Sequence, residues 1–336
     1  MKGFMMELRP EIKPLAVHPA VIHKIVCPVC HEKLRIEGEN FLCENPDCGD
    51  IFPVVQGVPV LIHEKNSIFK IDYICKDIKN KKKQAENSKL FLHKLSKAWP
   101  NADQNLKVRD NFKKLVQLLQ KNKNVNDVLV IGGGEGGVGF EILKAQSNSI
   151  RLTDTDVVYG TRTQLICDAH DIPFSDQSFE AVVIQAVLEH VVNPERCVRE
   201  IHRVLKKDGL VYSDTPFIQQ VHMGAHDFTR YTHLGHRRLF RQFEEISSGP
   251  SCGPGMALAW SFEYFVTSFF RNKWLIRMAT AATRLMGFWL RFFDRYLIHQ
   301  PGAFDSASST YFMGRKSDVT VTDRDVLTQY GGNHAL

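Results

Sequence analysis

Residues 127–139 read DVLVIGGGEGGVG, a short apolar run followed directly by a glycine-rich loop. The run 127–131 predicts a buried strand, and Phe140, Ile142 and Leu143 after the loop have helical spacing. Glycine is needed where a strand turns sharply into a helix and a ligand must come close to the backbone. The stretch therefore predicts an α/β sheet that binds a nucleotide-like cofactor at its first strand.

The glycine loop does not by itself identify the cofactor. Gly132, Gly134 and Gly137 satisfy the spacing G-x-G-x-x-G, which suits NAD, FAD and S-adenosylmethionine alike. Asp154 and Asp156 follow roughly twenty residues later, where a carboxylate accepts hydrogen bonds from ribose hydroxyls. Asp154 ends the predicted second strand more cleanly and is the favoured ribose ligand, with Asp156 as the alternative.

The chain around this loop has the pattern of a parallel α/β core. Residues 106–216 alternate short apolar runs with helical patterns. Asn193 can cap a helix that begins at Pro194, and Lys206 is expected near the carboxyl end of that helix. Further strands are expected at 150–153, 165–167, 181–184, 210–212 and 309–313.

Four of the eight cysteines form two close pairs near the N-terminus. Cys27 and Cys30 make the first pair, and Cys43 and Cys48 make the second, with twelve residues between the pairs. Zn²⁺ takes four thiolate or imidazole ligands at tetrahedral corners, and two tight turns supply them with little loss of chain entropy. Because cysteines fill all four positions, the spacing predicts a structural zinc. Four free cysteines or a redox pair are the alternative.

The residues around these cysteines also resemble a known module. The runs CPVC, CENPDC and FPVVQGVPVL, within residues 27–61, are similar to the zinc ribbon that occurs as the small partner subunit of some RNA and protein methyltransferases. The second cysteine pair encloses four residues here, where that ribbon usually has two. The resemblance implies a small β zinc ribbon.

A second resemblance separates the candidate cofactors. Residues 167–191 read CDAHDIPFSDQSFEAVVIQAVLEHV, and residues 203–209 read RVLKKDG. With the glycine loop, these runs make residues 128–216 closely similar to the class I S-adenosylmethionine-dependent methyltransferases, because five motifs occur in the same order. The resemblance implies a Rossmann-like, seven-stranded methyltransferase sheet with helices on both faces, and S-adenosylmethionine as the cofactor.

The methyltransferase resemblance also implies roles for individual residues. The glycine loop would hold the methionine part of the cofactor, and the acid after the second strand would hold its ribose. The Asp168 carboxylate and the Ala169 backbone would hold the adenine, and Gln185 and Leu188 would flank the cofactor. The loop residues expected to bind it are Gly132, Gly133, Gly134, Glu135 and Gly136.

Titratable residues gather after the predicted fifth strand, where α/β enzymes build substrate sites. The run 226–232 reads HDFTRYT and resembles one in bacterial methyltransferases of cell-surface glycan pathways. His226 is the candidate general base, and Arg230 is the candidate anion-binding group. A capped helix start with surface histidines is the alternative. The other candidates for acceptor contact are His190, His222, Asp227 and Tyr231.

Residues 256–298 combine many aromatic side chains with arginines. Such a segment predicts a helical insertion at about 256–300, ahead of the last strand. Helices of this kind pack as a lid on the sheet, which is the favoured interpretation, or lie on a membrane surface. A lipid-linked acceptor is compatible with both, and the second would place the protein at the inner face of the membrane.

The composition is that of a globular protein with one large core and an accessory module. The chain has 336 residues, of which 43% are hydrophobic and 24% charged. Its net charge of +6 is mild and not gathered into a stripe, so nucleic acid is not an expected partner. Residues 1–26 lack the apolar core of a secretory signal, so the expected location is cytoplasmic. The expected domains are an extension (1–20), a zinc ribbon (21–63), a linker with a helix (64–105) and the methyltransferase domain (106–336).

Three functions follow as hypotheses. The favoured one is methyl transfer from S-adenosylmethionine to an acceptor such as a glycan or a lipid-linked precursor of the cell surface. An NAD-dependent oxidoreductase or epimerase would share the glycine loop, but no Tyr-x-x-x-Lys pair follows that loop. A non-catalytic scaffold that binds the cofactor without turnover is the third.

Overall fold

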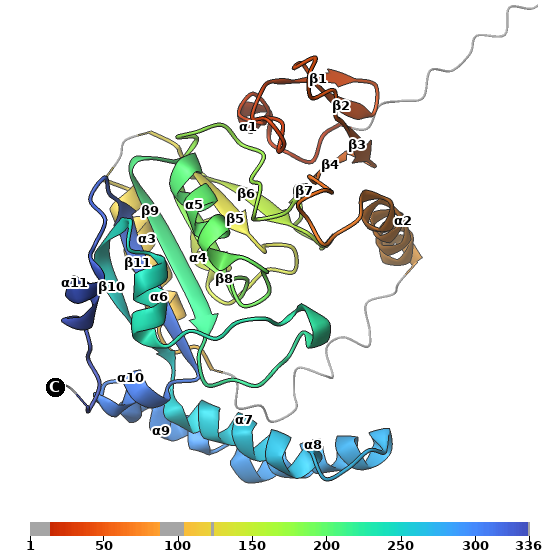
Figure 1. Cartoon of the computed structure of the whole chain (residues 1–336). Coiled ribbons are helices and arrows are strands. Elements are labelled where there is room, and N and C mark those ends of the chain that lie inside the picture. Colours follow the sequence, from red (N-terminus) through yellow and green to blue (C-terminus); the bar gives the residue numbers. More distant parts are fainter. Residues whose placement is uncertain (1–13, 88–103, 122–123, 335–336) are drawn as a thin grey trace, which may run out of the picture.

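The computed structural model describes residues 14–87, 104–121 and 124–334 (Figure 1). Most of the expected N-terminal extension, residues 1–13, lies outside the described residues. So does the part of the expected linker over 88–103.

One mixed sheet organises the described chain, with strand order β1-β2-β3-β4-β7-β6-β5-β8-β9-β11-β10. The strands from β7 to β9 are parallel, and β11 runs antiparallel to both β9 and β10. The seven strands from β5 to β11 confirm the predicted Rossmann-like fold class. They are β5 (Asn126–Ile131), β6 (Ile150–Asp156), β7 (Leu165–Cys167), β8 (Phe179–Gln185), β9 (Leu205–Pro216), β10 (Phe243–Cys252) and β11 (Ser309–Lys316).

Separate hydrophobic cores cover the two faces of this sheet. Along β5, Val128 and Val130 join one core, and Leu129 and Ile131 join the other, because neighbouring side chains of a strand point to opposite faces. The first core contains α3 (Val108–Leu119) and α4 (Phe140–Lys144), and the second contains α5 (Pro194–Val204) and the end of α6 (His233–Leu239).

The start of α5 agrees with the sequence, and its end does not. The Asn193 side chain accepts a hydrogen bond from the backbone of Arg196, and Pro194 is the first helical residue. The helix ends before Leu205, where β9 already begins. Lys206 therefore lies in the strand, where it forms an ion pair with Glu180 instead of interacting with the end of the helix.

The cysteine-bearing segment is built into the edge of the core sheet. After a short α1 (Pro19–Ile22), its strands form an antiparallel array whose last member, β4, pairs in parallel with β7. Lys24 adds a second connection, since its Nζ lies 2.6 Å from Asp127 Oδ2 at the start of β5. The strands are β1 (Leu34–Glu37), β2 (Asn40–Cys43), β3 (Ile51–Val55) and β4 (Val58–Leu61).

α2 (Ile71–Asn87) covers the part of the sheet where β4 meets β7. β6 and β7 are joined by residues 157–164 alone, and parallel strands usually need a dozen or more connecting residues with a helix. Ile74 and Ile78 of α2 pack instead with Val60 and Ile166. α2, which follows the cysteine-bearing segment, thus covers β7 in place of the helix that residues 157–164 are too short to form.

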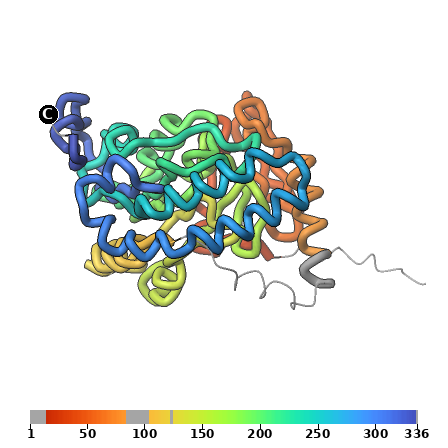
Figure 2. The backbone as a smooth tube through the Cα atoms, turned by 90° about the horizontal axis from the view of Figure 1, so that it is seen from below, coloured from red at the N-terminus to blue at the C-terminus, as the bar shows by residue number. Residues whose placement is uncertain are grey.

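A layer of helices separates β10 from β11 in the sequence. Seen from below, the layer extends across that face of the molecule (Figure 2). Asp294 ties α9 to α7, because its carboxylate accepts from the backbone N–H groups of Gly255 and Met256. No helix among the described residues is long and apolar enough to cross a bilayer. The helices are α7 (Pro254–Thr267), α8 (Lys273–Gly287), α9 (Leu290–Leu297) and α10 (Gly302–Ser306), and α11 (Asp323–Leu327) follows β11.

Candidate functional site

The glycine loop turns at the carboxyl end of β5 through close backbone contacts. The N–H groups of Gly132 and Gly133 both donate to the carbonyl of Thr155, at 2.9 and 3.0 Å. Gly132 has φ +75°, and a Cβ at this position would overlap Cγ2 of Val187. The conformation and the lack of space both require glycine.

Both candidate ribose acids lie beside this loop. Asp156 Oδ2 accepts from the N–H of Gly134 at 3.0 Å, and Asp154 accepts from Arg162 Nη2 at 2.8 and 3.0 Å. Burial raises the pKa of both carboxyls, and the Arg162 guanidinium opposes this rise at Asp154. Which of the two acids contacts ribose stays a prediction: the glycine loop donates to Asp156, whereas Asp154 pairs with Arg162.

The short connection between β6 and β7 supports the loop through residues that were not predicted. The N–H of Arg162 donates to the carbonyl of Gly134 at 3.1 Å, and its guanidinium lies 4.7 Å from the centre of the Phe140 ring. A Cβ on Gly160 would overlap the backbone of Gly134. In the sequence, only one feature points to Gly160 and Arg162: they lie in a connection that is too short to form a helix.

Asp168, the acid predicted to hold adenine, is buried and accepts hydrogen bonds at both oxygens. Its Oδ2 accepts from Ser67 Oγ at 2.5 Å, and its Oδ1 lies 2.5 Å from His170 Nδ1. His170 Nε2 accepts from the N–H of Asn193, so the ring proton is on Nδ1 and points to Asp168. Burial favours the neutral acid, but the hydrogen bonds from His170 and Ser67 outweigh it and lower the pKa of Asp168. Ala169, the expected backbone partner of adenine, is also buried.

Ser67 connects the cysteine-bearing segment to this site. Because β4 is parallel to β7, the chain that leaves β4 emerges at the same edge of the sheet as Asp168. The sequence analysis did not predict Ser67, which is 101 residues from its partner.

The end of β8 offers an unused acceptor to a ligand. Gln185 Oε1 is buried without a hydrogen-bond partner among the described residues. A Cβ on Gly137 would lie 3.0 Å from this atom, so the oxygen faces the glycine loop. Leu188 is buried three residues further on. An unpaired acceptor beside a cradle that excludes side chains fits the ammonium end of a methionine-like ligand.

Glu189, His190 and His222 form a compact cluster beyond this point. The Nε2 atoms of the two histidines lie 3.1 Å apart. Glu189 Oε1 lies 3.8 Å from His190 Nε2 and 4.0 Å from His222 Nε2. Burial raises the pKa of Glu189 to about 8 and lowers the pKa of His190. His190 and His222 were predicted as acceptor contacts, whereas Glu189 was not.

The segment 226–232 places its predicted residues in different roles. Arg230 forms an ion pair with Asp227 and donates to the carbonyls of Gln219 and Gln220, so its guanidinium holds the loop after β9 together. The hydrogen bonds from Arg230, against some burial, hold the pKa of Asp227 well below its usual range. The His226 ring stacks on Phe69 with centroids 5.9 Å apart.

Tyr231 lies apart from these residues. It lines a cavity of about 410 Å³ together with Arg199, Arg238 and Arg241. The structure therefore brings together four of the predicted acceptor residues, and the fifth, Tyr231, lines a cavity to which the other four do not belong. The four are His190, His222, Asp227 and Arg230.

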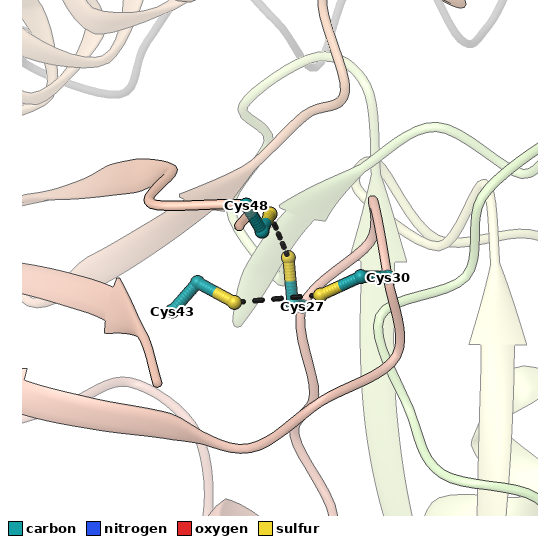
Figure 3. A group of neighbouring side chains, drawn as sticks. All are labelled: Cys27, Cys30, Cys43 and Cys48. Carbon is teal, nitrogen blue, oxygen red and sulfur yellow. Dashed lines mark hydrogen bonds between the residues drawn. The ribbon is translucent and has the colours of Figure 1, made fainter. Parts of the chain in front are cut away.

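The four N-terminal cysteines point toward one another (Figure 3). Cys27 Sγ lies 3.8 Å from Cys48 Sγ, and Cys30 Sγ lies 3.4 Å from Cys43 Sγ. Four sulfurs at about 2.3 Å from one zinc ion would lie about 3.8 Å from each other. The longer second pair closes through a turn in which the Cys48 N–H donates to the carbonyl of Asn45 at 3.1 Å. The cluster is consistent with a zinc ribbon.

Residues 129–213 match the family described as "Methyltransferase domain". The ubiquinone/menaquinone biosynthesis C-methyltransferase UbiE of Xanthomonas oryzae is 38% identical over 80 residues, which cover 23% of this chain and 31% of that protein. An uncharacterised protein of Methanocaldococcus jannaschii is 38% identical over 108 residues, covering 30% and 49%. The chain thus spans less than half of either relative.

Among solved structures, phosphoethanolamine N-methyltransferase 2 of Haemonchus contortus in complex with S-adenosylmethionine has a TM-score of 0.41. It is 15% identical, and the match covers 62% of this chain and 53% of that one.

Proposed function

We propose that this chain, whose residues 129–213 form a class I S-adenosylmethionine-dependent methyltransferase domain, transfers a methyl group to an acceptor bound beside β8 and β9. The observation that carries this proposal is the glycine cradle with the unpaired Gln185 Oε1 beside it. Bound S-adenosylmethionine supplies an electrophilic methyl group on a sulfonium. The protein has to align the acceptor with that methyl, and orientation accounts for a large part of such rate enhancements.

Different residues of the chain would bind the two ends of the cofactor. Gln185 would accept from the methionine ammonium, and the backbone of the loop from Gly132 to Gly136 would lie along the methionine chain. Asp168 and the Ala169 backbone would hold adenine, with Ser67 and His170 fixing the carboxylate. Asp154 or Asp156 would bind the ribose.

Titration calorimetry of the full chain tests the cofactor assignment. We expect S-adenosylmethionine to bind with a micromolar or lower dissociation constant and NAD to show no heat of binding. Both ligands carry adenosine, so the contact of Gln185 with the methionine ammonium is what separates them, and each factor of ten in affinity corresponds to about 1.4 kcal/mol. Binding of NAD in place of S-adenosylmethionine would contradict the proposal.

The acceptor that we propose is a glycan or lipid-linked precursor met at a membrane surface. The helices α7, α8 and α9 and their connections carry exposed apolar side chains and exposed cations, including Arg271, Lys273 and Arg277. Residues 254–298 contain two acids, Glu263, which pairs with Arg284, and Asp294, which caps α7. The exposed apolar residues are Leu258, Phe265, Phe269, Phe270, Trp274, Leu275, Met278, Leu285, Met286, Trp289, Phe292, Phe293 and Tyr296.

This helical layer contacts the loop that carries His222. Tyr264 of α7 donates its hydroxyl proton to the carbonyl of Val221, and Gln220 Nε2 donates to Ser261 Oγ at 3.0 Å. The loop 217–223, which carries His222, is therefore fixed to α7 by these two hydrogen bonds. An apolar surface with basic residues binds anionic bilayers, which would bring a lipid-linked acceptor to this loop.

Vesicle flotation tests this contact. We expect the chain to bind vesicles that contain phosphatidylglycerol, and to bind phosphatidylcholine vesicles at least tenfold more weakly, with added salt reducing the difference. Phe269→Ser with Trp274→Ser should reduce binding at least tenfold, because both side chains are mostly exposed. Val319→Ser is the control, since Val319 is also exposed but lies after β11. If the double variant and the control bind vesicles equally well, the helical layer is not the surface that contacts the membrane.

A further inference from the structure

We propose that Glu189, His190 and His222 form a binding site for a divalent transition metal, with zinc as the representative ion, on the acceptor side of the proposed cofactor site. These residues come from two segments, the turn after β8 and the loop after β9. Their three ligand atoms face one another in the described structure. The site is separate from the four cysteines, which form their own cluster.

The two imidazoles are oriented as metal ligands. His190 Nδ1 lies 2.7 Å from the carbonyl oxygen of His226, which can only accept, so the proton sits on Nδ1. His222 Nδ1 lies 3.4 Å from the carbonyl of Gln220 and 3.5 Å from Asp227 Oδ2, two further acceptors. Both Nε2 atoms therefore present lone pairs to each other at 3.1 Å. Outer acceptors fix metal-binding histidines in this way.

The Glu189 carboxylate supplies the third ligand. Its side chain is fully buried, and its Oε1 has no hydrogen-bond partner among the described residues. A buried acceptor without a partner is unfavourable, and so are two lone pairs that face each other. One cation between the three atoms would satisfy all of them.

The separations suit a first-row metal. Distances of 3.1, 3.8 and 4.0 Å between the three atoms place them on a circle with a radius of about 2.1 Å, which equals common zinc–nitrogen and zinc–oxygen distances. An ion at the centre of that circle would have both sides of the ligand plane open. Two histidines and one carboxylate with open positions are typical of catalytic metal sites.

The site is held in place by contacts that do not involve the ion. The backbone carbonyl of Glu189 accepts from the N–H groups of Phe228 and Thr229, at 2.7 and 3.2 Å. The pair of Asp227 and Arg230 fixes the loop on which His222 lies. Both ligand segments are thus joined to each other before any metal binds.

The position of the site indicates the chemical class of the acceptor, and this part rests on the proposed methyl transfer. Glu189 directly follows Leu188, one of the residues expected to flank the cofactor. A metal with an open position lowers the pKa of a hydroxyl group bound there and so makes its oxygen a better nucleophile. We therefore infer a hydroxyl acceptor. In that reaction the hydroxyl proton passes to water, the oxygen–methyl bond forms, and the sulfur–methyl bond breaks with its electron pair returning to sulfur.

Metal content tests the site without reference to methyl transfer. The full chain is incubated with zinc, desalted and analysed by mass spectrometry. We expect two zinc ions per wild-type chain and one per chain in His222→Ala and in His190→Ala. His299→Ala, a variant of an exposed histidine in the helical layer, should keep two. One ion in the wild type, or two in the His222 variant, would overturn the proposal.

Cobalt provides a second readout that distinguishes the two sites. Cobalt bound to the cysteines gives an intense thiolate charge-transfer band, whereas a histidine and carboxylate site does not. The wild type should bind a second equivalent of cobalt without adding to that band, and His222→Ala should not bind it. A thermal melt confirms that each variant is folded. Calorimetry with S-adenosylmethionine tests methyl transfer separately, so failure of one proposal is distinguishable from failure of the other.

Discussion

Replacement of Cys30 and Cys43 by serine should release the ribbon zinc and raise the dissociation constant of S-adenosylmethionine at least tenfold. Zinc bound by four thiolates contributes on the order of 10 kcal/mol to the folding of such small modules. Without it, the short strands that end in β4 have little core of their own. Loss of β4 would free Ser67, which donates to Asp168 at 2.5 Å.

The experiment compares zinc content, resistance to proteolysis and cofactor affinity in one set of variants. Cys75→Ser is the matched control, because Cys75 is a half-buried cysteine of α2 outside the cluster. The control should keep its zinc and its affinity for S-adenosylmethionine. If the double serine variant loses zinc but binds the cofactor as tightly as the wild type, the ribbon does not support the adenine side of the site.

The parts of the fold that depend on neighbouring residues could be predicted from the sequence. β7 spans Leu165–Cys167, the same residues as its apolar run. α5 begins at Pro194 behind the Asn193 cap, since capping is a contact between residues three apart. The paired cysteines and the glycine loop are local in the same sense. Each of these features carries its own physical reason within a short stretch of chain.

Contacts between distant segments could not be predicted in this way. The pairing of β4 with β7 is one example, because no pattern in residues 58–61 indicates which strand they will join. Ser67 reaches Asp168 only through that pairing. Arg162 lies in an unusually short connection, and it contacts Asp154 because the connection folds back over the glycine loop.

The residues proposed to contact the acceptor show the same difference between local features and contacts of distant segments. His190 and His222 were predicted separately, as titratable residues near strand ends. Their contact with each other and with Glu189 depends on how the loop after β9 folds, and the ion pair of Asp227 with Arg230 determines that fold. Arg230 was predicted to bind an anion of the acceptor, but its guanidinium is engaged by Asp227 and by backbone carbonyls.

Gly132→Ala should weaken the binding of S-adenosylmethionine at least a hundredfold. A side chain at φ +75° costs about 1–2 kcal/mol relative to glycine. The added methyl would also overlap Cγ2 of Val187, and overpacking of this kind costs about 1–3 kcal/mol. The loop can relieve the overlap by moving away from Val187 and into the space that the cofactor needs. Calorimetry measures the affinity, and a thermal melt measures the loss of stability.

Two further variants separate the backbone effect from the overlap. Gly38→Ala has a similar φ of +60°, and no described atom lies within 4 Å of the added Cβ, so it should lose some stability and keep its affinity for the cofactor. Val187→Ala combined with Gly132→Ala removes the overlapping methyl and should recover at least tenfold in affinity. Coupling of this kind is expected only between residues in contact. If the double variant binds no better than Gly132→Ala alone, crowding against Val187 is not what closes the loop, and the positive φ of Gly132 carries the whole effect.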